Sequence, residues 1–482
     1  MDITLRFFGT AQCRSAIFAV KQNFSKESNM QQKSLTTTIT ECMFDIDVDA
    51  IPADLSEQAK RLLIDLLGVG IAGSVQEEVA PIFQTFKNWG GKPESLVWNY
   101  GVRLPAHAAS VVNGAFAHAL ELDDTHRTTY LHVGASIVPT VFAIGEVAHS
   151  SGGEVLRALI AGYETMLRIA LAVSPEHRFQ GFHPTGTLGV FGTAMAASLL
   201  LKLDIQQTVH ALGLAGTQSS GLFQFVHDGC SSKRYHPGHA AQSGITAAYL
   251  AKAGFTGSAE ILEGEDGFFK VMSPQSHPDR VTDRLGSYWH ILEMGIKPYS
   301  ACRFCHAPID AARALRAHPA WDISKLQRLE LICSRQLFEQ TGNNAPSTPM
   351  GAQLSTPNAM AIALIYGSNM PVDIEAHFND PQVAELAKQI VLTVDNNIPR
   401  TARNVLLKAQ LQGVDSELHF TVALPKGEPE NPLSREETRN KFLGLSSPVL
   451  GKSKAEKLLQ VIEHIEDIAD IQEIMPVLTA EA

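Results

Sequence analysis

The stretch "GTLGVFGTAMAASLLLKL", residues 186–203, decides the fold class of this chain. Gly186, Gly189 and Gly192 recur at intervals of three, and several alanines follow them. Small residues on one side of a helix allow a second helix to approach closely, and a helix that is apolar on all sides is buried. We therefore predict a central packing helix. No predicted strand precedes these glycines, which disfavours a phosphate-binding loop.

Several further apolar segments flank this stretch, and each is bounded by Gly, Pro or Ser. Apolar residues recur in them at helical spacing, and the first segment opens with Pro52 in a first-turn position. Together they predict a large all-helical domain over residues 46–294. The segments cover residues 51–74, 102–120, 136–153 and 154–173.

The character of the sequence changes near residue 300, where segments with β-branched residues and alternating polarity begin. A helix is expected at 356–367, and the last two strands flank "QGVDS" as a hairpin. We predict a smaller α+β lid domain over 295–428 and C-terminal helices over 429–482, with Ser434 and Glu437 at capping-box spacing, packing back on the helical domain. The fold class is thus mainly α with a second α+β domain. The predicted strands cover residues 326–338, 389–398, 402–411 and 416–425.

Composition excludes several classes of protein. The formal charge of −11 over 482 residues argues against nucleic-acid binding, because a phosphate backbone requires a basic surface. No apolar run is long enough to cross a bilayer. Six cysteines are too few for a disulfide scaffold and fit a reducing compartment. A small anionic substrate remains compatible with this charge if cations gather in a pocket.

The first 34 residues hold five basic and two acidic residues, and we predict an N-terminal extension over 1–45 that is outside the fold. It resembles a transit peptide, or it reflects an upstream start codon, since Met30 precedes the first convincing helix. The expected location is the cytoplasm, or the mitochondrion if the extension is a transit peptide.

Polar groups interrupt the helical sequence at four places. The first, "ELDDTHRTTYLH" (121–132), brings Asp123, Asp124, Thr125 and His132 together after an apolar helix. Paired acids also cap helices, so a structural interpretation stays open there. His107 and His118, which lie within apolar sequence, are interpreted as core residues. The second place, "RFQGFHPTGTLG" (178–189), puts His183 at the mouth of the small-residue helix.

The third place, "FVHDGCSSKRYHPGHAAQSG" (225–244), is rich in cations and includes Lys233, Arg234 and His236. Buried cations need anionic partners, so we predict an anion site, with a helix N-terminus near Gly238. The fourth, "IKPYSACRFCHAPIDAA" (296–312), adds Lys297, Tyr299 and His306 at the domain junction.

Cys302 and Cys305 form the one close cysteine pair in the sequence. A structural zinc site needs four ligands and usually a second close pair, which the sequence lacks, so we predict no metal.

Carboxylates, imidazoles and cations at helix ends suit proton transfer at a carbon next to a carboxylate, with the developing charge held by Lys, Arg and His donors. The sequence has no dinucleotide fingerprint, P-loop or nucleophile elbow, which disfavours redox, phosphoryl and serine-hydrolase chemistry.

Several motifs resemble the MmgE/PrpD family: "ELDDTHRTTYLHVGASIVP", "GFHPTGTLGVFGTAMAA", "KRYHPGHAAQSGITAAYLAKAGFTG", "LEGEDGFFKVM", "KPYSACRFCHAPIDAA" and "PKGEPENPLSREETRNKF". The resemblance runs from about residue 50 to the end. It implies a large helical domain, a smaller α+β lid, a homodimer and no cofactor. The family includes 2-methylcitrate dehydratase, cis-aconitate decarboxylase and iminodisuccinate epimerase.

The resemblance also assigns residues. The family's acidic–Thr motif matches Asp123, Asp124 and Thr125, its histidines match His132 and His183, and its substrate and junction lysines match Lys233 and Lys297. Animal decarboxylases carry a histidine where this chain has Cys302, so that role is absent here or moves to His306.

The first hypothesis is a cofactor-independent lyase on a small di- or tricarboxylate, most plausibly a cis-aconitate decarboxylase. Lys233, Arg234 and Lys297 would hold carboxylates, His132 and His183 would exchange the proton, and Asp123 or Asp124 would orient an imidazole. The alternatives are a citrate-type dehydratase, an iminodisuccinate-type epimerase and a non-catalytic carboxylate-binding homologue.

Overall fold

Helix α8 (Pro184–Leu200) contains the small-residue stretch and is buried along almost its whole length. It packs against α6 (Gly152–Val173) and α11 (Ser232–Lys252). A Cβ atom on Gly192 would lie 2.5 Å from the carbonyl oxygen of Gly162 in α6, and one on Gly189 would lie 2.8 Å from Cβ of Ala240 in α11. The glycines therefore permit the close approach of these helices, and the predicted central helix is confirmed.

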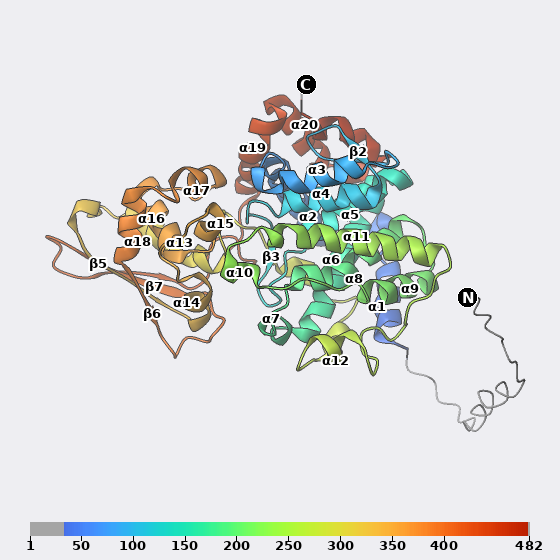
Figure 1. Ribbon diagram of the computed structural model, residues 1–482, viewed down its shortest axis with the longest axis horizontal. Helices are drawn as coiled ribbons and strands as arrows, with labels where there is room; N and C mark the ends of the chain where they lie inside the picture. The colour runs from blue at the N-terminus through green and yellow to red at the C-terminus, as the bar shows by residue number, and fades with distance from the viewer. Residues whose placement is uncertain (1–32, 481–482) are drawn as a thin grey trace, which may run out of the picture. The chain divides into compact units, whose positions relative to one another are not determined.

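The computed structural model describes residues 33–480, and Figure 1 shows the arrangement of its elements. The prediction for residues 1–32 lies outside this range. Residues 35–44, which the sequence analysis placed in the extension, form a helix that packs against α9. None of the helices described is both long and apolar enough to span a bilayer. The other helices of the helical domain are α1 (Leu35–Phe44), α2 (Ala53–Gly73), α3 (Ala80–Trp89), α4 (Ala106–Ala117), α5 (Gly134–Ala148), α7 (Glu176–Phe179), α9 (Ile205–Gly216), α10 (Phe225–Asp228) and α12 (Phe268–Met272).

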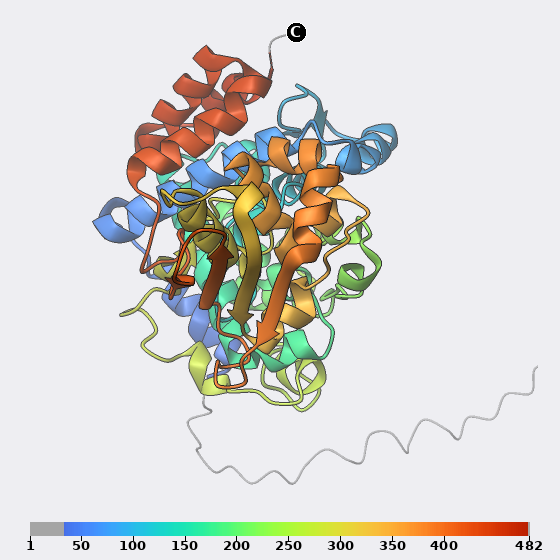
Figure 2. The same cartoon turned by 90° about the vertical axis from the view of Figure 1, so that its left-hand side faces the viewer.

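The α+β domain is built on a four-stranded sheet with the order β6–β5–β7–β8, and its strands face the viewer in Figure 2. The predicted hairpin is confirmed, because β7 (Val405–Leu411) pairs antiparallel with β8 (Leu418–Val422). β5 (Leu326–Cys333) and β6 (Ile390–Val394) are parallel, and helices connect them. The connecting helices are α14 (Arg335–Thr341), α15 (Pro349–Gln353), α16 (Thr356–Tyr366), α17 (Pro371–His377) and α18 (Pro381–Gln389), and α13 (His306–Arg316) precedes β5.

The expected strand over 326–338 is too long. Strand β5 ends at Cys333, and the next residues form helix α14. The side chain of Ser334 accepts a hydrogen bond from the backbone N–H of Leu337, which is the geometry of a helix N-cap. A capping signal in this segment therefore outweighs the alternation of apolar residues.

The C-terminal helices α19 (Arg435–Leu450) and α20 (Lys452–Glu463) pack against α2 of the helical domain, as predicted. Ser434 and Glu437 form the expected capping box at the start of α19. In Figure 1 both helices lie beside the helical domain, although the chain reaches them only after passing through the α+β domain.

A short antiparallel ladder joins the charged turn to the domain junction. Strand β3 (Thr125–His126) pairs with β4 (Met294–Gly295), so Thr125 lies opposite Gly295. The turn that follows α4 is thereby held against the segment that leads into the α+β domain.

The prediction of a helix N-terminus near Gly238 is wrong. Helix α11 begins at Ser232, and Gly238 lies in its interior against α4. A Cβ atom on Gly238 would lie 2.2 Å from the carbonyl oxygen of Val111. The glycine therefore serves close helix packing.

Gly238→Ala should lower the free energy of unfolding by about 1–3 kcal/mol, because the added methyl group has no space between α4 and α11. Gly444→Ala is the matched control, since its Cβ would meet nothing within 4 Å and alanine favours a helix. Urea unfolding measures both. Equal stability of the two variants would contradict the close packing.

Candidate active site

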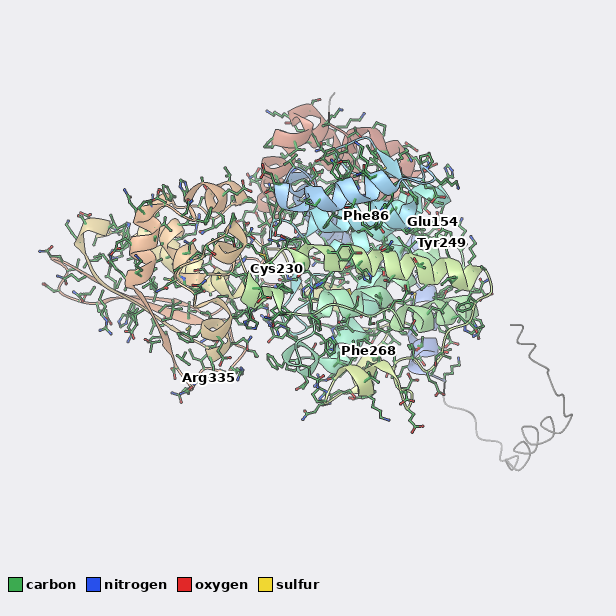
Figure 3. The ribbon with its side chains drawn as sticks, viewed as in Figure 1. Phe86, Glu154, Cys230, Tyr249, Phe268 and Arg335 are labelled. Carbon is green, nitrogen blue, oxygen red and sulfur yellow. The ribbon has the colours of Figure 1, made fainter. Side chains whose placement is uncertain are left out.

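A pocket lies at the junction of the helical and α+β domains, and both contribute side chains to it. Figure 3 labels Cys230 at the edge of this junction, just beyond α10. The helical domain supplies imidazoles and cations, and the α+β domain supplies arginines and a thiol. The polar side chains that line it are Glu121, Thr125, His126, Tyr130, His132, Arg178, His183, Lys233, Cys302, Arg303, Gln340 and Arg403.

The buried carboxylate of Asp123 contacts two imidazoles. Nδ1 of His118 lies 2.7 Å from Oδ2 of Asp123, and Nδ1 of His132 lies 3.1 Å from the same oxygen. The backbone N–H of His132 donates to Oγ1 of Thr185 in the first turn of α8, at 3.0 Å. His132 is thus fixed at its backbone by the central helix and at its ring by Asp123.

The charge of this cluster follows from burial and mutual attraction. Burial favours the protonated form of Asp123, but His118 and His132 outweigh it and hold the pKa of the carboxyl well below its usual range. Burial lowers the pKa of His132, while Asp123 opposes that shift. The negative charge of Asp123, 3.1 Å from Nδ1, favours the tautomer of neutral His132 that carries its proton on Nδ1. Its Nε2 then has the lone pair that takes up a proton.

A second imidazole pair lies beside this cluster. Nδ1 of His183 lies 2.9 Å from Nδ1 of His236, so one ring donates to the other. Burial lowers both pKa values, to about 4 for His236 and well below the usual range for His183. His183 lines the pocket, whereas His236 supports it from α11.

The buried carboxylate of Glu121 collects three cations. Lys233 donates to it, Oε1 of Glu121 lies 3.1 Å from Nζ of Lys297, and Oε2 lies 3.4 Å from a nitrogen of Arg234. Burial favours the protonated form of Glu121, but Lys233 and Lys297 hold its pKa well below the usual range. Arg234 also lies 3.2 Å from a carboxylate oxygen of Glu78. Two negative charges therefore face three positive charges, and the group keeps one surplus positive charge that attracts an anion.

Seven of the eleven predicted site residues do not line the pocket. Four of them contact lining residues from behind: Asp123, Arg234, His236 and Lys297. The other three have partners outside the pocket. Asp124 lies behind it, where its carboxyl accepts from the hydroxyl of Tyr163 at 2.8 Å and from the N–H of Gly134 at 3.0 Å. The hydroxyl of Tyr299 donates to Asp310 at 2.6 Å. His306 is enclosed between the guanidinium of Arg303 and the carbonyl of Ala301.

Several residues of the site were not predicted from the sequence, and three of them bear on its chemistry. His118 was interpreted as a core histidine, yet it shares Asp123 with His132. Glu121 stands in the quoted turn but was not singled out. Arg178 opens the second quoted stretch, and its side chain reaches the pocket. Helix α4 ends at Ala117, which turns His118 back towards Asp123, and the apolar pattern of α4 gives no sign of this.

His118, Asp123 and His132 each offer one atom of the kind that binds metals, and these atoms lie within 4.8 Å of one another. Two ligands of a tetrahedral zinc ion at about 2.0–2.1 Å would be roughly 3.3 Å apart. The 2.7 Å between His118 and Asp123 is shorter and is a hydrogen-bond distance. In this arrangement a hydrogen bond joins His118 to Asp123, where a shared metal ion would need a wider spacing.

Two family models match this chain. The MmgE/PrpD N-terminal domain matches residues 37–281, and the MmgE/PrpD C-terminal domain matches residues 299–467. Together they cover most of the sequence. The chain belongs to the MmgE/PrpD family. The resemblance stated from the motifs is therefore confirmed, and so is the predicted helical domain with a smaller α+β domain.

The relatives of this MmgE/PrpD protein include decarboxylases. It is 28% identical to the cis-aconitate decarboxylase-like protein oryM of Aspergillus oryzae, over 93% of this chain and 98% of that protein. It is 27% identical to the cis-aconitate decarboxylase of Aspergillus terreus, over 91% and 94%, and 28% identical to that of Mus musculus, over 90% and 91%. Decarboxylases are carbon–carbon lyases, and this chain is a lyase of the MmgE/PrpD family.

The buried carboxyl of Asp124 predicts a pH-dependent stability. Burial and the neighbouring Asp123 raise its pKa from 3.8 to about 8. A raised pKa means that the folded protein keeps a proton that the unfolded chain releases. The stability from this group is therefore full below about pH 3.8 and falls until about pH 8.

Asp124→Asn should remove that part of the fall, so the variant gains free energy of unfolding relative to the wild type as the pH rises from about 4 to about 8. Urea unfolding at several pH values measures the difference. Asp415→Asn, at an exposed turn residue, is the control and should follow the wild type. A constant difference for Asp124→Asn across this range would contradict the assignment.

Proposed function

We propose that this protein converts cis-aconitate to itaconate and carbon dioxide without a cofactor. The observation that carries the proposal is an imidazole oriented by a buried carboxylate, His132 on Asp123, in one pocket with an excess of cations around Lys233. The relatives named as cis-aconitate decarboxylases support the choice of substrate.

The reaction needs one proton and no oxidant. The trianion of cis-aconitate takes up a proton and yields the itaconate dianion and carbon dioxide. The C–C bond to the carboxylate on the methylene carbon breaks, and its electron pair forms the new terminal double bond. The former double bond supplies the electron pair that binds the proton, at the carbon next to the far carboxylate. Cations beside that carboxylate stabilise the charge that develops on it.

The residues divide this work. Lys233 carries positive charge to the pocket wall beside Glu121, with Arg234 and Lys297 behind it. His132 delivers the proton from Nε2, because a trianionic substrate favours the imidazolium form and offsets the effect of burial. Asp123 stabilises that imidazolium through Nδ1. His183, on the same pocket wall, returns a proton to the site.

The apolar part of the pocket suits loss of carbon dioxide. Phe223, Phe225 and Phe304 line it beside the charged groups. A carboxylate placed against these rings loses its hydration, whereas neutral carbon dioxide does not need water. The apolar wall therefore favours neutral carbon dioxide over the substrate carboxylate from which it forms.

Proton NMR of the purified protein with cis-aconitate in D₂O should show itaconate with one deuterium on the saturated carbon next to the carboxylate, and none on the terminal =CH₂, as this proton delivery requires. Parallel samples with citrate, 2-methylcitrate and iminodisuccinate serve as comparisons. Loss of water from 2-methylcitrate or citrate would favour a dehydratase, and deuterium uptake by iminodisuccinate without breakdown an epimerase. No change in cis-aconitate would contradict the proposal.

His132→Ala should lower kcat by about 10²–10⁴-fold and change KM little, because it removes the proton donor and leaves the cations in place. His419→Ala, on the exposed edge strand β8, is the matched control and should keep wild-type kinetics. An unchanged kcat in His132→Ala would remove this residue from the proton path.

Lys233→Ala should raise KM about 10-fold or more, because the substrate loses a buried charged donor. Lys388→Ala replaces an exposed lysine on α18 and should leave KM unchanged. Initial rates over a range of cis-aconitate concentrations give both constants. Wild-type KM in Lys233→Ala would end the assignment of this lysine to carboxylate binding.

A further inference from the structure

The pocket contains an arginine whose charge the protein does not neutralise. Most cations there have a carboxylate partner: Arg303 and Arg403 lie 3.0 and 2.8 Å from Glu428, and Lys233 donates to Glu121. Arg178 differs from them. Within the part of the chain that the structure describes, its side chain has neither an ion pair nor a hydrogen bond.

Arg178 is nevertheless held in a defined place. Its guanidinium carbon lies 3.2 Å from the ring centroid of Phe223, and both side chains line the pocket. The ring of Phe223 supports one face of the guanidinium by a cation–π contact. This contact uses the face and leaves the N–H groups at the edge available, in the planar arrangement that matches a carboxylate.

The chain around Arg178 is also fixed. Arg178 lies in α7, five residues before His183, and the N–H of Phe223 donates to the carbonyl of Gly181 at 2.7 Å. Phe182 and Leu222 form a β-bridge beside this contact. The segment that carries His183 and the segment that carries Phe223 are therefore joined, which places Arg178 relative to the proton-transfer groups.

Burial in this position has an energetic consequence. A half-buried cation without a carboxylate loses hydration and gains no ion pair in return. Burial lowers the pKa of Arg178 only to about 10, so the side chain stays charged at neutral pH. Its titratable neighbours are Tyr130 and Cys302, and burial raises the pKa of both, so they are neutral at neutral pH. The neighbours of Lys233 are the charged groups of Glu121, Lys297 and Arg234. Arg178 is thus a second positive charge in the pocket, with different neighbours from those of Lys233.

We propose that Arg178 binds a substrate carboxylate that does not react, separate from the one held near Lys233, and so selects tricarboxylates over dicarboxylates. This inference rests on the proposed decarboxylase function and adds the residue that determines its substrate class. The charge and the free N–H edge of Arg178 supply the partner that a third carboxylate requires.

Isothermal titration calorimetry with two unreactive acids tests this role. Tricarballylate has the three carboxylates of the substrate without its double bond, and methylsuccinate lacks one of them. We expect the wild type to bind tricarballylate about 10- to 100-fold more tightly than methylsuccinate. Arg178→Met should remove most of that ratio, weakening tricarballylate and leaving methylsuccinate within about 2-fold.

Two further variants support the comparison. Arg178→Lys keeps the charge without the planar fork and should retain part of the preference, which also covers a failure of the methionine variant to fold. Arg335→Met is the matched control, because Arg335 is exposed on the α+β domain, as Figure 3 shows, and should leave both affinities unchanged.

The outcomes separate the two proposals. If both acids bind the wild type and the ratio is unchanged in Arg178→Met and Arg178→Lys, the role of Arg178 is overturned and the proposed function is not. An equal loss for both acids also overturns it, because selection needs an effect on one carboxylate alone. If the wild type binds neither acid and leaves cis-aconitate unchanged, the proposed function fails, and the inference fails with it.

Discussion

The site depends on the ion pairs that the buried carboxylate of Glu121 forms. This carboxylate joins the turn after α4 to Lys233 and Arg234 of α11 and to Lys297 at the domain junction. Nζ of Lys297 also donates to the backbone carbonyl of Glu121, at 2.9 Å. Removing one partner of such a buried group leaves an uncompensated charge, which costs about 3–5 kcal/mol. Glu121, with Glu78 beside Arg234, therefore holds the cations inside the protein, and Lys233 brings positive charge to the pocket wall.

The same turn carries the groups for proton transfer two residues further on. Asp123 holds His118 and His132, while Asp124 turns the other way, towards Tyr163 and Gly134. One turn thus supplies both Glu121, which gathers cations, and Asp123, which orients imidazoles. Glu121 pairs with the cations and Asp123 pairs with the imidazoles, so the groups that bind substrate charge are separate from the groups that transfer the proton.

Much of the fold could be predicted from local signals in the sequence. The glycine spacing of α8, the capping box at Ser434 and the hairpin at "QGVDS" all depend on residues close in the chain. The site was harder, because its contacts join distant residues. His118 looks like any core histidine until the end of α4 brings it to Asp123, and Gly238 looks like a helix start until α4 is packed against it. Lys233 and Lys297 were singled out as cations in polar stretches, and the family resemblance assigned their roles.

The contact of α4 with α11 has one more consequence. Gly114 and Gly238 meet there backbone to backbone, since a Cβ on Gly114 would lie 2.7 Å from Cα of Gly238. Gly114 lies four residues before His118, and Gly238 lies five residues after Lys233. The spacing between the main chains that carry His118 and Lys233 is therefore set by two helices at their limit of approach. Because this spacing is between main chains, rotamer changes of the side chains do not alter it.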